Sequence, residues 1–431
     1  MESVWNKTTE FKKFNRLDKN IKTDVLVVGG GITGLLCAHA LKNAGVDYCV
    51  AEAGRICSGI TKNTTAKITS QHGLCYSKLI KSCGPEKAGL YLKANEDAVK
   101  EYYRLCSKID CNFEEKSSFV YSVDDEQLMD DELNALQKLR FPARFQRELP
   151  LLFKTVGAVK FEYQAQFNPL KFLSAISDNL NIYENTRVCE IMENVAYCNG
   201  ASIKANIIIV ATHFPFINKH GSYFLKMYQQ RSYVAALENA QNLNGMYIDA
   251  DKNGFSLRNY KNYLLLGGGG HRTGTPSNGW QPLKEFKEKY YPGSEIKYYF
   301  STQDCMTLDK IPYIGRYSAR THNLFVATGF NKWGMTSSMV AAKVLCDMVC
   351  LKNNEFIDLF SPSRSIIKPQ LVINAGHALA GMVNFGTKRC PHLGCALKWN
   401  KSEHSWDCPC HGSRFTKNGK LIDNPATGDI K

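Results

Sequence analysis

Two short boxes near the end of the chain contain the side chains best suited to metal chemistry. The first box, 390–395, reads Cys-Pro-His-Leu-Gly-Cys, and the second, 408–415, reads Cys-Pro-Cys-His-Gly-Ser-Arg-Phe. Thiolate sulfur and imidazole nitrogen are the ligands that zinc and iron–sulfur centres use in proteins. This spacing therefore predicts a metal centre, and a zinc site is the simplest alternative at this point.

The order of residues in the boxes resembles the Rieske signature, Cys-x-His-x-x-Cys followed by Cys-x-x-His. In a Rieske centre two cysteines hold one iron of a 2Fe–2S cluster and two histidines hold the other. The resemblance implies that the ligands are Cys390, His392, Cys408 and His411. A centre of this kind transfers electrons one at a time.

Four further residues of the boxes have counterparts in known Rieske proteins. The resemblance to the respiratory members implies a disulfide between Cys395 and Cys410 beside the cluster. Ser413 matches the serine that donates to a cluster sulfide in high-potential Rieske proteins, whereas Phe415 stands where they have a tyrosine. Hydrogen bonds to the sulfurs help to set the potential, so one donor of two predicts an intermediate value within roughly −150 to +300 mV.

The segment 23–52 has the pattern of a dinucleotide-binding unit. A predicted strand, 23–28, leads into Gly-Gly-Gly-Ile-Thr-Gly and then a predicted helix, 35–43. Gly29 is expected to make the tight turn, Gly31 to let the backbone approach a pyrophosphate, and Gly34 to let the helix pack on the strand. Glu52 follows the next predicted strand and is placed to accept a hydrogen bond from a ribose hydroxyl.

The segment 59–72 favours a flavin over a nicotinamide cofactor. It is polar and rich in hydroxyl groups, and it resembles the flavin-wrapping loop of the D-amino-acid oxidase and glycine oxidase superfamily, which binds FAD. The segments 205–212, 309–315 and 323–336 resemble later FAD-binding segments of that superfamily, in the same order. Motif and resemblance together imply FAD contacts by Gly29, Gly31, Gly34, Glu52, Thr64, Thr65, Val188, Ala211, Gly329, Gly334, Met335 and Thr336.

These segments predict an α/β fold (α+β overall), with a Rossmann-like FAD-binding domain interleaved with an antiparallel-sheet substrate domain. Residues 1–365 form this oxidoreductase; about 20–75, 150–212 and 305–360 are assigned to the FAD-binding domain, and about 76–149 and 213–304 to the substrate domain. Helices are expected at 86–109, 131–139, 169–180 and 332–348, and short strands at 232–237, 246–249, 255–258 and 263–266. The glycine run 267–270 predicts a loop.

The remaining part, 366–431, is predicted to be a small C-terminal Rieske 2Fe–2S domain whose cluster-binding part is 388–431. Rieske domains usually have a β-sandwich base before the first box. Here the preceding stretch is short, and 370–385 has a helix-like pattern. We therefore expect a minimal cluster-binding subdomain that depends on the flavoprotein for its stability.

The residues that bind the substrate are the least defined by the sequence. In the amino-acid oxidases, an arginine eight residues before the proline equivalent to Pro312 binds the substrate carboxylate, and that position is Asp304. An aspartate cannot make the bidentate contact of a guanidinium with a carboxylate. Either the substrate is an amine or another cation held by Asp304, or Arg258 or Arg272 binds a carboxylate. Further candidates for the pocket are His72, Lys332, Gln71, Tyr263 and Gln303, and no general base is assigned.

Composition restricts the partners and the location. The net charge of +14 suits an acidic electron-transfer protein, an anionic substrate or a peripheral contact with a membrane. Basic residues are scattered without a long run, so we expect no nucleic-acid binding. The polar segment 1–20 lacks the apolar core of a signal peptide, no apolar run is long enough to span a membrane, and twelve of the sixteen cysteines lie outside the boxes without framework spacing. We expect a cytoplasmic protein.

FAD and a 2Fe–2S cluster in one chain predict an oxidoreductase that converts two-electron into one-electron transfer. The main hypothesis is oxidation of an amine or amino acid by hydride transfer to FAD, with electrons passing singly through the cluster to an external acceptor. The alternatives are a reductase fed by an external donor through the cluster, and an electron-transfer or redox-sensing module without turnover.

Overall fold

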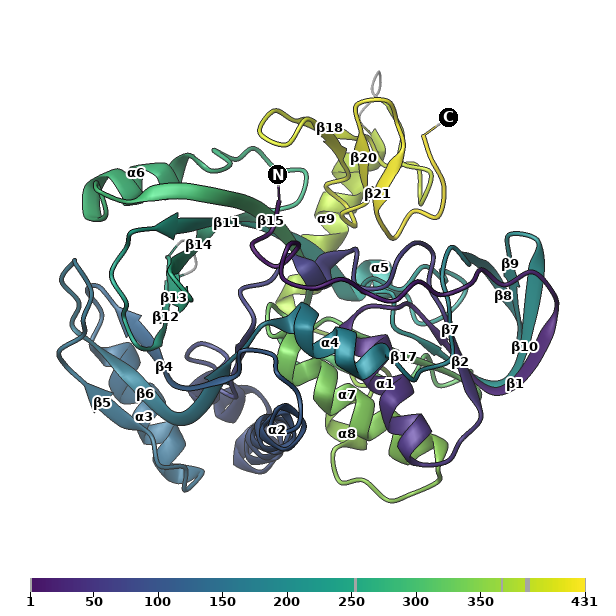
Figure 1. Cartoon of the computed structure of the whole chain (residues 1–431), viewed down its shortest axis with the longest axis horizontal. Helices are drawn as coiled ribbons and strands as arrows, with labels where there is room; N and C mark the ends of the chain where they lie inside the picture. The colour runs from purple at the N-terminus through teal and green to yellow at the C-terminus, as the bar shows by residue number, and fades with distance from the viewer. Residues whose placement is uncertain (1, 252–253, 366, 384–387, 431) are drawn as a thin grey trace.

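The fold is described from a computed structural model, which covers residues 2–251, 254–365, 367–383 and 388–430 (Figure 1). Within these residues the strands form a mostly parallel sheet, a large antiparallel sheet and a small C-terminal sheet. In Figure 1 the antiparallel sheet lies on the left, the parallel sheet on the right, and the C-terminal sheet at the top. The predicted α/β class with two interleaved sheets is confirmed.

The parallel sheet is built around β1, whose apolar residues alternate between two cores. Val25 and Val27 pack into the core that contains α1 and α7, and Leu26 and Val28 pack on the opposite face. A parallel strand covered on both faces has such a continuous apolar run. The strand order is β16 (Tyr313–Arg316), β17 (Leu324–Thr328), β10 (Ala201–Val210), β1 (Ile21–Val28), β2 (Tyr48–Ala51) and β7 (Ile182–Tyr183), with β8 (Val188–Met192) and β9 (Val195–Cys198) attached to β10. The helices of this part are α1 (Ile32–Asn43), α4 (Pro169–Ser177), α7 (Gly334–Val349) and α8 (Ile357–Phe360).

The second sheet is larger and almost entirely antiparallel. Its order is β15 (Glu295–Thr307), β11 (Met227–Glu238), β14 (Tyr263–Arg272), β13 (Ser256–Tyr260), β12 (Met246–Asp249), β4 (Glu114–Ser122), β6 (Gly157–Gln166) and β3 (Lys67–Ile68), with β5 (Arg144–Gln146) attached to β6. Only β12 and β4 pair in parallel among these described strands. The associated helices are α2 (Tyr76–Cys106), α3 (Gln127–Lys138), α5 (Tyr223–Lys226) and α6 (Gln281–Tyr290).

Two assignments made from the sequence differ from the structure. We placed 150–212 and 20–75 in the FAD-binding domain, but β6 and β3 belong to the antiparallel sheet. An apolar alternating segment does not specify its partner strand, so the sequence pattern could not separate the two sheets. The glycine run 267–270 is strand, not loop, because β14 stays paired with β11 as far as Arg272.

The C-terminal part consists of α9 (Pro369–Val383) and the strands β18 (Lys398–Asn400), β19 (Ser405–Asp407), β20 (Arg414–Thr416) and β21 (Leu421–Asp423). The helix agrees with the predicted 370–385, although 384 and 385 lie outside the described residues. The strands form one antiparallel meander; the first cysteine and histidine box precedes β18, and the second lies between β19 and β20 and extends into β20. Among the helices that the structure describes, none combines the length and apolar character needed to cross a bilayer.

Candidate cofactor and cluster sites

The turn after β1 has the geometry that a dinucleotide pyrophosphate requires. Gly29 has φ +110°, and a Cβ there would lie 2.7 Å from the Ala211 carbonyl oxygen. A Cβ at Gly34 would lie 1.8 Å from the Gly29 carbonyl oxygen, so α1 can approach β1 only with glycine at this position. Gly31 precedes α1 without a side-chain cap, which leaves backbone N–H groups at the helix N-terminus for an anion.

The turn opens into a cavity of about 430 Å³. Glu52 lies at its wall and accepts hydrogen bonds from the backbone N–H groups of Gly30 (2.7 Å) and Gly54 (2.8 Å). Burial raises the pKa of Glu52, although these bonds oppose the shift. The N-terminus of α7 also reaches the cavity without a side-chain cap, and its positive end suits a site where negative charge develops. These groups fit FAD.

Most of the predicted FAD contacts line this cavity. They are Gly29, Gly31, Glu52, Thr64, Val188, Ala211, Gly329, Gly334 and Met335. Gly34, Thr65 and Thr336 are not among the lining residues. Gly34 acts through helix packing, the Thr65 hydroxyl accepts a hydrogen bond from Lys67 (3.1 Å), and the Thr336 hydroxyl bonds His72 and the Thr69 carbonyl.

The loop 59–72 is held by side chains that we had considered for the substrate pocket. The buried guanidinium of Arg258 donates to the carbonyls of Ala66 (3.2 Å) and Phe167 (3.4 Å) and lies over the ring of Trp5. The Trp5 indole in turn donates to the Thr64 carbonyl at 2.8 Å. Arg258 therefore stabilises the loop from behind and does not line the cavity.

His72 is also a support of this loop. Its ring stacks on Trp333 at 4.7 Å and bonds Tyr91 (2.6 Å) and Thr336 (2.9 Å). Burial lowers the pKa of His72 to about 3, so the imidazole is neutral at physiological pH. Gln71 donates to the Val159 carbonyl, and Tyr263 packs on Tyr298, and neither lines the cavity.

Asp304 and Lys332 are the two predicted substrate residues that the structure brings together at the cavity. Burial raises the pKa of Asp304 to about 6, against the opposing effect of Lys332 and Arg231. Burial lowers the pKa of Lys332, against the effect of Asp304, and its ammonium group donates to the Ser232 hydroxyl at 3.2 Å. An anionic and a cationic side chain thus lie at one end of the cavity.

The two boxes bring the four predicted ligands into two close pairs, one of cysteines and one of histidines. Cys390 and Cys408 are buried, and their thiols share a hydrogen bond that raises the pKa of Cys390 and lowers that of Cys408. The rings of His392 and His411 lie 4.9 Å apart, edge to face. The Nδ1 atoms of both histidines are buried without a hydrogen-bond partner, although buried imidazole nitrogens are normally paired. This donor set fits a 2Fe–2S cluster with Cys₂His₂ ligands.

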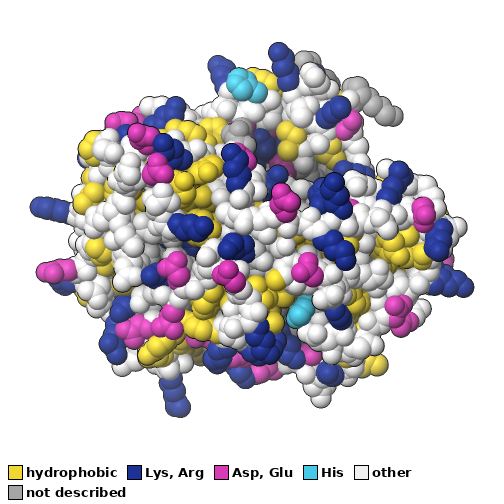
Figure 2. All heavy atoms as spheres, in the orientation of Figure 1, with side chains coloured by type: hydrophobic (Ala, Val, Ile, Leu, Met, Phe, Trp, Pro, Cys, Tyr) yellow, Lys and Arg dark blue, Asp and Glu magenta, His cyan; other side chains and the backbone are white. Residues whose placement is uncertain are grey.

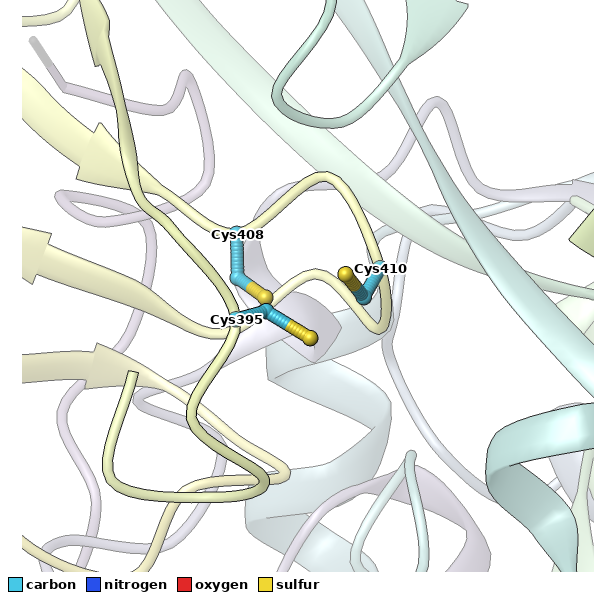
Figure 3. Close-up of side chains that lie close together, drawn as sticks. All are labelled: Cys395, Cys408 and Cys410. Carbon is cyan, nitrogen blue, oxygen red and sulfur yellow. The ribbon is translucent and has the colours of Figure 1, made fainter. Parts of the chain in front are cut away.

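Cys395 and Cys410 lie beside this ligand set as free thiols. Their sulfurs and that of Cys408 lie within 4.8 Å of one another, and Figure 3 shows the three side chains converging. A three-cysteine zinc site would use this group and leave the buried Nδ1 atoms of both histidines without a partner. The disulfide that the resemblance implied is not formed here.

Buried side chains of β11 and β15 bind the second box, 408–415, through hydrogen bonds. Gln229 donates to the carbonyls of His411 (2.7 Å) and Asn424 (3.2 Å), and Gln303 donates to the Gly412 carbonyl (2.8 Å). Gln303, which we had considered for the pocket, is therefore an interface residue. Arg272 is another, since it donates to the carbonyl of Pro409 and to Asn374 of α9.

A buried ion-pair network reinforces this interface. Arg231 of β11 pairs with Glu403, which also binds Arg414 at 2.9 Å, and Arg414 pairs with Asp407 and Asp423. The side chains of Arg231 and Glu403 are 2% and 3% exposed. These contacts agree with the expectation that the cluster-binding subdomain depends on the flavoprotein for its stability.

The C-terminal tail lines the cavity, which the sequence pattern did not predict. Leu421 to Asn424, Ala426 and Thr427 line the cavity beside Thr212 and His213. The Asn424 amide donates to the carbonyls of Thr212 and Phe214. Thr61, which accepts from the Ile32 N–H, was missed as well. The tail contacts residues more than two hundred positions away, so no local pattern could have shown its place.

Known proteins resemble both parts of the chain. The profile of the FAD dependent oxidoreductase family, DAO, matches residues 24–348, and that of the Rieske [2Fe-2S] domain matches residues 360–431. The chain is 34% identical to the "Putative Rieske 2Fe-2S iron-sulfur protein YhfW" of Bacillus subtilis, over 100% of this chain and 97% of that protein. It is also 48% identical to the cytochrome b6-f complex iron-sulfur subunit of a Synechococcus strain, over 12% of this chain and 30% of that protein.

Solved structures share the fold of the larger part. Glycine oxidase from Geobacillus kaustophilus has a TM-score of 0.66 and 20% identity, covering 80% of this chain and 99% of its own. L-proline dehydrogenase from P. horikoshii has a TM-score of 0.68 and 18% identity, covering 80% and 98%. The cofactors are those of the two matched units, FAD and a 2Fe–2S cluster. The chain belongs to the FAD dependent oxidoreductase family and carries a Rieske [2Fe-2S] domain at its C-terminus.

Proposed function

We propose that this protein oxidises an amine or amino acid and passes the electrons one at a time to an external acceptor. The observation that carries the proposal is a cavity whose walls combine the FAD turn, the pair Asp304 and Lys332, and the tail of the Rieske domain. FAD, when bound, accepts a hydride and releases electrons singly, and the cluster accepts one electron at a time.

The charges at the cavity favour a substrate with a positive group. The pKa of Asp304 is about 6, so its carboxylate is mostly ionised at neutral pH and can bind an ammonium group. Lys332 can bind a carboxylate in place of its contact with Ser232. An amino acid carries both charges, whereas a simple amine uses Asp304 alone.

No lining residue is assigned as a general base. The imidazole of His213 lies at the cavity, but burial lowers its pKa to about 4, which makes it a weak base at neutral pH. The role of the described side chains is to hold the substrate and exclude water.

Two further properties are part of the proposal. We infer that Cys395 and Cys410 form a disulfide when the cluster is assembled, because their sulfurs are already close. The twelve cysteines outside the boxes are free, which supports a cytoplasmic location.

Anaerobic spectroscopy of the holoprotein with a panel of amines and amino acids tests the proposal. We expect an amine or amino acid to bleach the flavin absorbance, followed by the EPR signal of the reduced cluster. If no compound bleaches the flavin, whereas a low-potential donor reduces cluster and then flavin, the chain works as a reductase and the proposed direction is wrong.

A further inference from the structure

The C-terminal tail, residues 421–427, is attached to the second box at several points. Its strand β21 pairs with β20, and the Arg414 guanidinium binds Asp423 at 3.2 Å. The backbone N–H of Ala426 donates to the Ser413 hydroxyl at 3.0 Å, and Ala426 packs among the buried cysteines of the two boxes. The Rieske domain therefore determines the position of the tail.

The same tail contacts the flavoprotein at the wall of the cofactor cavity. The Asn424 amide donates to the carbonyls of Thr212 and Phe214, and Thr212 lines the cavity. Six residues of the tail line this cavity together with the glycine turn after β1. The tail lies beyond residue 348, where the match to the FAD dependent oxidoreductase family ends. This part of the wall therefore comes from outside the matched flavoprotein unit.

Ile422 is the apolar residue of the tail that the protein leaves most exposed. Side chains alternate along a strand, and Leu421 packs on the apolar core of the Rieske domain, whereas Ile422 is 47% exposed and lines the cavity. An apolar side chain at such a wall gains free energy when a ligand covers it. Asp423 lines the cavity as well, but its pairing with Arg414 compensates its charge, so it does not oppose an anionic cofactor.

We propose that the C-terminal tail is part of the FAD-binding site, and that Ile422 contributes to the affinity by packing against the bound cofactor. The flavoprotein and the Rieske domain then share one cofactor site. Because coupling between two binding events is reciprocal, FAD also stabilises the docked position of the Rieske domain. The proposal does not depend on which substrate the protein oxidises.

Replacing Ile422 by alanine tests the proposal in the full-length holoprotein. The change removes most of the apolar side chain and leaves the hydrogen bonds of Asn424 in place. We expect the dissociation constant of FAD to rise about fivefold, because roughly half of an isoleucine is free to be covered. Ile422→Glu should weaken FAD binding further, since it places an unpaired carboxylate beside an anionic cofactor. Dilution of the holoprotein, followed by the rise in flavin fluorescence as FAD is released, measures the constant.

The matched controls are Leu152→Ala and Leu152→Glu. Leu152 is 49% exposed and does not line the cavity. Figure 2 shows basic and acidic side chains interspersed over the face that it draws, so one carboxylate added outside the cavity should change FAD binding little near physiological salt. The EPR g values and the visible circular dichroism of the cluster should match those of the parent protein in all four variants.

An unchanged dissociation constant of FAD in both Ile422 variants would overturn the proposal. An equal loss of affinity in the Leu152 controls would overturn it too, because the effect would then not depend on the position of the change. Weaker FAD binding in the Ile422 variants alone, with the cluster spectrum retained, supports the tail as part of the FAD site. If Ile422→Glu loses its cluster, the comparison of Ile422→Ala with Leu152→Ala decides the question.

Discussion

Replacing Arg231 by methionine tests whether the buried ion pairs hold the Rieske domain on the flavoprotein. The change removes the contacts of Arg231 with Glu403, Ser301 and Asp423. It leaves Glu403 (2.9 Å) and Asp423 (3.2 Å) paired with Arg414. Loss of one partner of a buried pair costs about 3–5 kcal/mol. Because Arg414 still compensates the charge of Glu403, we expect a loss near the lower limit, about 3 kcal/mol, which lowers the docked fraction roughly a hundredfold relative to the undocked one.

Denaturant titration with two signals measures this loss. Visible circular dichroism follows the cluster, and flavin fluorescence follows the FAD-binding domain. In Arg231→Met the cluster signal should disappear at a lower denaturant concentration than the flavin signal. The control is Arg147→Met, which removes an exposed pair with Glu126 and should change little. Equal midpoints of the cluster signal in Arg231→Met and the parent protein would show that this ion pair does not hold the Rieske domain in place.

Three further predictions concern the substrate, the cluster and the dependence of the domain. Asp304→Asn should lower kcat/KM for a cationic amine roughly tenfold to a hundredfold through loss of a charged hydrogen bond. In the parent protein kcat/KM should rise with pH through about 6, as the Asp304 carboxylate ionises, and the variant should lack this rise; an unchanged pH profile would exclude Asp304 as the ammonium partner. Phe415→Tyr should raise the cluster potential by roughly 40 mV, since one added hydrogen bond is worth about 1 kcal/mol. Redox titration monitored by EPR measures the potential. A lower potential in the variant would contradict the role assigned to this position. The fragment 366–431 should fail to hold a cluster, because Gln229 and Arg231 lie outside it; a stable fragment with a normal Rieske spectrum would show that the domain is independent.

The sequence predicted those sites whose residues lie close together in the chain. The glycine turn and both boxes consist of residues close together in the chain, so their spacing alone defines the geometry. Gly29 and Gly34 have the tight surroundings that the turn motif predicts, and the residues predicted as ligands form two close pairs, Cys390 with Cys408 and His392 with His411. The class of fold followed from the strand, turn and helix around the same glycines.

The substrate pocket and the interface could not be predicted in the same way. Arg258 and Arg272 lie on strands whose residues alternate between faces, and a one-residue change of register reverses the side on which each lies. Gln229 donates a hydrogen bond to His411, 182 positions later in the chain, and Arg231 donates one to Glu403, 172 positions later. Such contacts depend on how the two sheets and the Rieske domain pack, and no periodic pattern encodes that arrangement.

The glycine run in β14 shows the same limit for secondary structure. Consecutive glycines favour a loop when considered alone. In the structure a Cβ at Gly267 would lie 2.7 Å from the Ser256 hydroxyl, and a Cβ at Gly268 would lie 2.7 Å from the Phe255 ring. The side chains of Ser256 and Phe255 occupy the space beside these two glycines, so packing accounts for glycine at both positions.

We propose that FAD and the Rieske cluster exchange electrons within one chain. Flash photoreduction of the flavin in the anaerobic holoprotein, with the cluster followed by its visible absorbance, tests it without any substrate. We predict that the cluster becomes reduced at a rate independent of protein concentration, because the cavity wall and the second box belong to one docked assembly. Cluster reduction at a rate proportional to protein concentration, or a reduced flavin beside a cluster that stays oxidised, would show that the two centres do not exchange electrons within one chain.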